Sequence, residues 1–190
     1  MNGSKNKGRQ MNGLPATDWT IDDIVVGSTT KTWLRSKNLL PSTWNLPPDE
    51  IQKIRQAGIR LTMMYSPASV LKLRPNPLKD VAAASLIVFD ANAFDDDQQS
   101  REEKIATLLH EIGHVFHELA PKKSVIEALK AEEYVAAMDG QNESENAADD
   151  FARKLGYGEH IATSLEKLKT TCPEKFNKPG VDGRIKRMRK

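Results

Sequence analysis

The sequence predicts an α+β protein, with a small sheet followed by a helical half. Two short runs of β-branched and aromatic residues come first, at Ile59–Tyr65 and Ser85–Asp90. Four amphipathic helical patterns then follow between Ser100 and Cys172. Strands that precede the helices, rather than alternating with them, are typical of α+β proteins. We therefore expect a small antiparallel or mixed sheet in front of the helices.

Composition favours an ordinary globular chain. Its 190 residues are enough for one domain with its own core, and 38% of them are hydrophobic. The net charge of +2 provides no strong field toward nucleic acid or a membrane surface. No apolar run approaches the roughly 18–20 residues that cross a bilayer, and the N-terminus has no apolar signal region. Cys172 is the only cysteine, which excludes an internal disulfide and a thiolate zinc cluster. We expect a cytoplasmic protein without a membrane or nucleic-acid partner.

Three segments are expected along the chain. Residues 1–13 are rich in Gly, Asn, Lys and Ser and have almost nothing to bury, which predicts a disordered basic arm. Residues 14–172 are predicted to form a single domain. Residues 173–190 are a basic C-terminal segment, either a free tail or one short turn packed through Ile185 and Met188.

The first third of the domain shows few local signals. Its apolar residues are expected to anchor the core, namely Trp19, Ile21, Ile24, Val25, Trp33 and Trp44. A helix is predicted after Leu46, because Pro48 and two acidic residues occupy a first turn and Gly58 ends the pattern. The alternating run Ile59–Tyr65 then predicts a strand, and Ser85–Asp90 predicts a second one.

The second half of the chain has clear helix signals. Ser100 followed by Glu103 is a capping box, and apolar residues at helical spacing follow it. A second amphipathic helix is predicted at Ser124–Gly140. A third is predicted at Ser144–Gly156, with its serine as N-cap and its glycine as terminator. A fourth is predicted at Glu159–Cys172.

The first of these helices carries the segment "HEIGH". His110 and His114 are four residues apart, so both rings leave the same helix face about one turn apart. This separation allows two imidazoles to reach one tetrahedral Zn²⁺ at roughly 2.0–2.1 Å each. Glu111 lies roughly 100° around the axis, where it can reach a water on the metal. The segment thus has the form of an HExxH motif, with two metal ligands and a general base.

Two imidazoles do not complete a catalytic zinc site, which usually has three protein ligands and a water. His117 is the nearest further donor, but its ring belongs about a turn beyond the pair, so we predict that it stays outside the site. The helix around residues 143–150 offers several carboxylates, namely Glu143, Glu145, Asp149 and Asp150. Of these, Glu145 and Asp149 share one helix face. One carboxylate can therefore bind metal while the other orients a ligand histidine.

Two motifs together carry a resemblance to a known family. "HEIGH" followed by "ENAADDFARKLGY" (Glu145–Tyr157) resembles the gluzincin peptidases of the HtpX type. The similarity extends over roughly Ser85 to Met188, and the closing segment likewise has a proline before an Arg-Ile pair. It implies a zincin-like fold in which His110, His114 and Glu145 bind Zn²⁺. It also implies that Glu111 is the catalytic base and that Asp149 orients a ligand histidine.

The ImmA/IrrE-type metallopeptidases are rival relatives. They share a short strand before the motif, a further histidine after it and a glutamate that precedes an alanine-rich helix. Both resemblances imply a zinc-dependent endopeptidase with Zn²⁺ as cofactor and a protein or peptide as substrate. We expect an extended substrate to pair with Ser85–Asp90 as an edge strand.

A non-catalytic module, stabilised by zinc and used for interaction or assembly, is the alternative. Both functions require the metal, so zinc content does not separate them. Glu111 does separate them, because a closed structural zinc site has no use for a base beside it.

Overall fold

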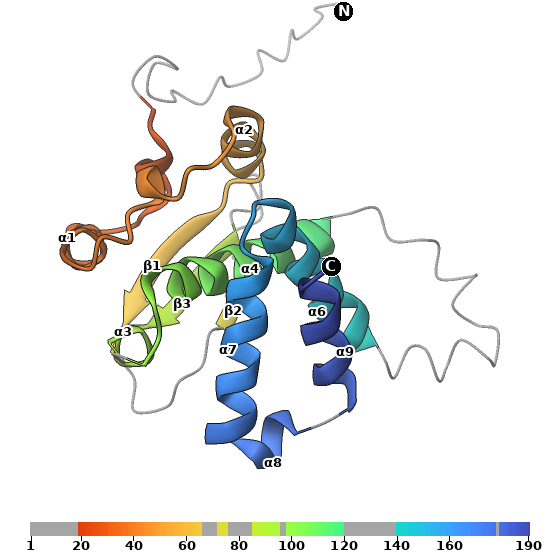
Figure 1. The fold of residues 1–190 in the computed structure, drawn as a ribbon. Helices are drawn as coiled ribbons and strands as arrows, with labels where there is room; N and C mark the ends of the chain where they lie inside the picture. The colour runs from red at the N-terminus through yellow and green to blue at the C-terminus, as the bar shows by residue number, and fades with distance from the viewer. Residues whose placement is uncertain (1–18, 66–71, 76–84, 96–97, 120–139, 178) are drawn as a thin grey trace, which may run out of the picture.

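The computed structural model describes residues 19–65, 72–75, 85–95, 98–119, 140–177 and 179–190. Within them the chain is mostly helical and contains a small sheet, so the α+β prediction is confirmed (Figure 1). The predicted arm at residues 1–13 lies outside the described residues. The predicted helix Ser124–Gly140 does too, except for Gly140 itself.

The N-terminal third is built from short helical elements. They are η1 (Ile21–Ile24), α1 (Ser28–Ser36), η2 (Pro41–Thr43) and α2 (Pro48–Gln56). The predicted helix after Leu46 is α2, and the chain leaves it through Gly58 at a φ of +63°. Five of the six expected core anchors are buried and Trp19 is partly buried, so the aromatic and branched residues of this third do anchor the core.

The sheet has three strands in the order β1 (Arg60–Met64), β3 (Ser85–Asp90), β2 (Lys72–Pro75). Strand β3 runs parallel to β1 and antiparallel to β2, so the sheet is mixed and a wholly antiparallel sheet is wrong. The prediction that Ser85–Asp90 is an edge strand is also wrong, because β3 has partners on both sides. Its apolar run "LIVF" is continuous rather than alternating with polar residues, a pattern typical of a strand covered on both faces.

The helical half consists of α3 (Ala91–Phe94), α4 (Arg101–Leu119), α6 (Gly140–Lys154), α7 (Gly158–Thr171), α8 (Pro173–Phe176) and α9 (Pro179–Met188). Helix α4 packs against β3, α6 and α7, while α9 packs against α6 and α7 (Figure 1). The capping box before α4 is present, since the backbone N–H of Ser100 donates to Glu103 Oε2 at 2.7 Å and that of Glu103 donates to Ser100 Oγ at 3.2 Å.

Two predicted helix boundaries need correction. Helix α6 begins at Gly140, so Ser144 lies inside the helix and is not its N-cap. The C-terminal segment is not a free tail, and it packs through Ile185 and Met188 as the second alternative predicted, but as the ten-residue helix α9 and not as one short turn. It buries Val181, Ile185 and Met188 in the same cluster as the N-terminal residues. The C-terminus is therefore part of the packed core.

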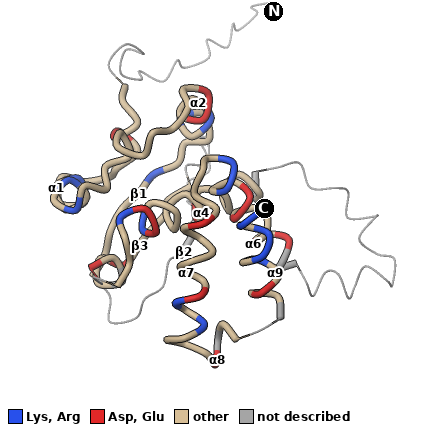
Figure 2. Tube along the Cα trace, in the orientation of Figure 1, with Lys and Arg blue, Asp and Glu red and all other residues tan. Residues whose placement is uncertain are grey.

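Charge and hydropathy over the described residues are unremarkable. Basic and acidic residues are interspersed along most of the described helices (Figure 2). None of the helices in the described ranges combines the length and the apolar character needed to cross a bilayer.

Helices α4 and α6 approach closely where Gly113 faces Ala148. A Cβ atom on Gly113 would lie 2.7 Å from the Cα and 2.8 Å from the carbonyl oxygen of Ala148, and 3.0 Å from the Cβ of Phe151. Two of these three atoms belong to backbone, which cannot turn aside as a flexible side chain can. The absence of a side chain at Gly113 therefore sets the distance between the two helices.

Gly113→Ala should destabilise the protein by about 1–3 kcal/mol, the usual effect of adding a methyl group to a packed interior. This loss should exceed the roughly 0.5–1 kcal/mol that alanine contributes over glycine inside a helix. Gly183→Ala in α9 is the control, because a Cβ there meets no atom within 4 Å. Urea unfolding followed by circular dichroism measures both variants, and equal stability of the two would contradict the close helix contact.

Candidate metal centre

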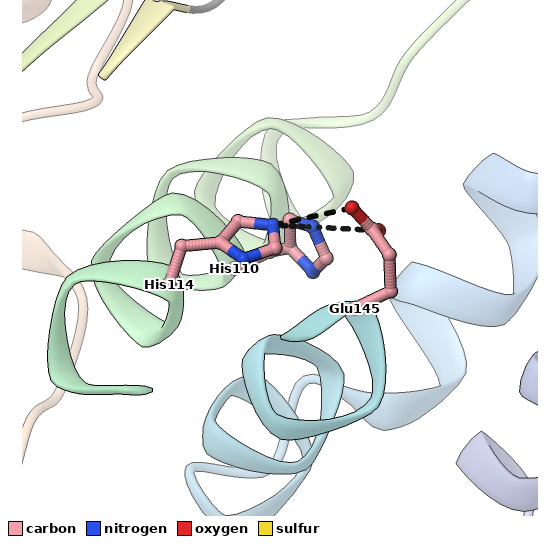
Figure 3. A group of neighbouring side chains, drawn as sticks. All are labelled: His110, His114 and Glu145. Carbon is pink, nitrogen blue, oxygen red and sulfur yellow. Dashed lines mark hydrogen bonds and ion pairs between the residues drawn. The ribbon is translucent and has the colours of Figure 1, made fainter. Parts of the chain in front are cut away.

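Three predicted ligands converge between α4 and α6. His110 and His114 project side by side from α4, and Glu145 reaches toward them from α6 (Figure 3). The two Nε2 atoms are 3.1 Å apart. One oxygen of Glu145 lies 3.4 Å from Nε2 of His110, and the other lies 3.4 Å from Nε2 of His114. The structure thus brings together the three side chains that the sequence pattern and the resemblance had selected.

The spacing of these atoms fits a single zinc ion. Two ligand atoms at 2.0–2.1 Å from a tetrahedral ion lie about 3.3 Å apart. The 3.1 Å between the two Nε2 atoms is close to that value, as is the 3.4 Å from each Nε2 to one of the two oxygens of Glu145. One ligand atom from each of the three residues lies within 4.8 Å of the other two. Two imidazole nitrogens and a carboxylate also form one of the donor sets found at catalytic zinc sites, which keep a fourth position open. His110, His114 and Glu145 would therefore hold Zn²⁺.

The far side of each imidazole has a partner of its own. Nδ1 of His110 lies 2.9 Å from Asp149 Oδ1, a close contact although its angle falls short of good hydrogen-bond geometry. Nδ1 of His114 lies 2.9 Å from Ser144 Oγ. Both rings consequently turn Nε2 toward Glu145, and outer partners of this kind orient metal-binding histidines. Asp149 lies where the sequence had placed it, whereas the role of Ser144 was missed because it was taken for a helix cap.

Asp149 and Glu145 are both held by Arg184 of α9. Arg184 donates to the fully buried Asp149 through Nε at 2.7 Å and through Nη2 at 2.9 Å. Its Nη1 lies 2.9 Å from Glu145 Oε2. Sequence reasoning assigned Arg184 no role, and the only signal was the Arg-Ile pair in the closing segment. The C-terminal helix therefore supplies a cation that fixes two carboxylates of the site.

The site has a strongly perturbed charge balance. Burial lowers the pKa of His110, but its contacts with Asp149 and Glu145 raise it more, to about 9. Burial raises the pKa of Glu145, but its contacts with His110 and His114 have the larger, opposite effect. The pKa of this carboxyl therefore lies well below its usual range. Asp149 behaves in the same way, with His110 and Arg184 lowering the pKa of its carboxyl. Both carboxylates therefore stay ionised, and a bound cation would take the place of the proton on His110.

Glu111 lies in the same cavity as the three donors. The cavity has a volume of about 340 Å³, and Glu111, His110, His114 and Glu145 all line it. Burial raises the pKa of Glu111, while His110 and His114 act in the opposite direction. No hydrogen bond or ion pair of the Glu111 side chain occurs within the described part of the chain. The carboxyl group of Glu111 therefore lies beside the donors without a hydrogen-bond or ion-pair partner among the described residues.

The other candidates lie elsewhere. His117 belongs neither to the donor group nor to the cavity lining, and Glu143 is exposed. Asp150 pairs with Arg153 at 3.2 Å and with Arg187 of α9 at 3.6 Å, and it belongs neither to the donor group nor to the cavity lining. Tyr157 donates its hydroxyl to the carbonyl of Trp44 at 3.0 Å and is absent from the cavity lining.

No family model, curated protein or solved structure matches the chain.

Glu145→Ala should lower zinc affinity by more than the 10- to 100-fold typical of losing an outer partner, because a direct ligand is removed. Metal analysis after dialysis against a zinc buffer measures the effect. Glu143→Ala and His117→Ala are matched controls on the same two helices and should keep the metal. If either control lost as much zinc as Glu145→Ala, the third ligand would be the residue changed in that control.

The chelator-treated protein should become less stable between about pH 6.5 and pH 9. Because the pKa of folded His110 is raised from 6.5 to about 9, its contribution is complete below pH 6.5 and is lost as the pH rises through 9. The free energy of unfolding should fall by roughly 3 kcal/mol in total over this range. Urea unfolding in EDTA at several pH values should show the decline in the wild type and a much flatter profile in His110→Gln. If the wild type and His110→Gln lost stability in parallel as the pH rises, His110 would not be the cause of the decline.

Proposed function

We propose that the chain is a zinc-dependent endopeptidase with a zincin-like fold. His110, His114 and Glu145 are the proposed zinc ligands, and Glu111 is the proposed general base. The observation that carries the proposal is the position of Glu111, whose carboxyl group shares a cavity with the donors and is bound to none of them. A structural zinc site, in contrast, is closed by protein ligands on all sides.

Each residue around the donors has its own proposed role in the hydrolysis. A bound Zn²⁺ would lower the pKa of a coordinated water toward about 7 and polarise the scissile carbonyl. Glu111 accepts the proton of the attacking water and later donates it to the leaving amine. Burial raises the pKa of Glu111, which favours its holding that proton between the two steps. Asp149 and Ser144 keep the imidazoles in the orientation that exposes Nε2.

Further support for a zincin-like arrangement comes from the order of elements. A mixed sheet precedes the helix with the HExxH motif, and a second helix then delivers a carboxylate to the histidines. This order agrees with both the HtpX-type and the ImmA/IrrE-type resemblance, since both require the same residues. The proposed zincin would act on proteins or peptides in the cytoplasm.

An extended substrate requires a different strand from the one first expected. Strand β3 is central, and the outer edge of β1 is contacted by Val26, whose N–H donates to the carbonyl of Leu61 at 2.7 Å. Strand β2 lies at the opposite edge of the sheet. We therefore assign β-strand addition of the substrate to β2.

Glu111→Gln should abolish most activity while leaving the metal in place. Glutamine keeps the size of the side chain but removes its basic oxygen, so peptide cleavage should fall by the roughly 10²–10⁴-fold typical of lost general-base catalysis. Zinc content and thermal stability should be nearly unchanged. The measurement is turnover of a mixed peptide library by the zinc-loaded protein, with cleavage read by mass spectrometry.

Glu102→Gln, in the first turn of the same helix and outside the cavity lining, is the control and should cut at the wild-type rate. Wild-type turnover by Glu111→Gln would refute the proposed mechanism. A zinc-loaded wild type that cuts nothing in the library would favour the alternative, a zinc-stabilised interaction module.

A further inference from the structure

The cavity beside Glu111 has an apolar wall as well as a metal-binding side. Helices α7 and α8 supply this wall through Ile161, Leu165, Leu168 and Phe176. Because these side chains line the same cavity as Glu111 and the three donors, a group bound at the metal would lie against them. A polar centre joined to an apolar wall is the usual form of a small-ligand or side-chain pocket.

Ser164 is the small residue within that wall. It lies on α7 between Ile161 and Leu168 and is 8% exposed. Its Oγ has no hydrogen-bond partner in the described ranges. Leucine or isoleucine at this position would fill space that the serine leaves open. Ser164 therefore sets the depth of the wall.

The charges of the cavity do not suit a charged side chain. Arg184 is the cation of its lining, but Nε and Nη2 are occupied by Asp149 and Nη1 by Glu145. An acidic side chain would be desolvated without a free partner, which is unfavourable. A basic side chain would find no partner on the apolar wall, and the two carboxylates of the lining, Glu111 and Glu145, are assigned to proton transfer and to the metal.

We propose that this wall is the binding pocket for an apolar side chain, such as that of leucine, methionine or phenylalanine, on a residue flanking the scissile bond. The proposal rests on the proposed peptidase function and specifies its substrate class. Ser164 is the residue that determines the size of the accepted side chain.

The test uses N-acetyl amino-acid hydroxamates, which bind an open zinc ion and place one side chain beside it. Isothermal titration of the zinc-loaded wild type should give about 10- to 100-fold tighter binding of the leucine hydroxamate than of the glycine hydroxamate, the gain expected from burying a leucine side chain. Aspartate and lysine hydroxamates should bind no tighter than the glycine compound. Equal binding of the leucine and glycine compounds, tighter binding of a charged one, or no hydroxamate binding would overturn the pocket.

Variants of the wall provide a second measurement. Ser164→Ile should reduce the leucine preference at least five-fold while zinc content and glycine-hydroxamate binding stay constant. Thr170→Ile is the control, because Thr170 is an exposed residue of the same helix. Leu168→Ala enlarges the pocket and should shift preference from leucine toward phenylalanine. Unchanged preferences in both wall variants would also reject the pocket.

The peptide library separates this inference from the proposed function. Tight leucine-hydroxamate binding without any peptide cleavage would retain the pocket and reject the peptidase. Cleavage without preference for apolar residues on either side of the bond would retain the peptidase and reject the pocket. Cleavage next to leucine, methionine or phenylalanine would support both.

Discussion

The buried carboxylate of Asp149 is the constraint on which the site depends. Asp149 is inaccessible to solvent, and removing an ionised carboxylate from water costs several kcal/mol unless cations and donors surround it. Here His110 comes from α4 and Arg184 from α9, and both contact Asp149 on α6. Three helices that are distant in sequence must therefore dock together before this charge is compensated. The orientation of the His110 ring follows from that docking.

Glu145 belongs to the same network, one helical turn before Asp149. Arg184 contacts both carboxylates, so the group that compensates the buried charge also positions the proposed ligand. The approach of α4 to α6 at Gly113 brings Glu145 within reach of both imidazoles. Metal affinity and packing of the C-terminal helix are consequently coupled. A change that loosens α9 would leave Asp149 undercompensated and Glu145 free to turn away.

Local signals predicted the parts of this structure that depend on neighbours in sequence. The capping box at Ser100, the strand at Ser85–Asp90 and the spacing of His110 and His114 each lie within a few residues, and each is present. The features that the sequence analysis did not predict depend on contacts between residues far apart in the chain. Strand β3 is central because β1 and β2 add to both of its edges, which no local pattern specifies. Arg184 gained a role only because α9 packs onto α6, beyond the reach of sequence periodicity.

The distribution of partners around the donors bears on the choice between an enzyme and a structural module. Each group that would hold the metal has a support behind it, whether Asp149, Ser144 or Arg184. Glu111 is also partly buried, yet no hydrogen bond or ion pair supports its side chain among the described residues. An unpaired, half-buried carboxyl group is a cost in stability, and proteins tolerate such costs mainly at functional sites. A module that needed zinc only for folding would gain by replacing Glu111 with an apolar residue. The position of Glu111 in the cavity therefore favours the proposed role in proton transfer over a role in folding alone.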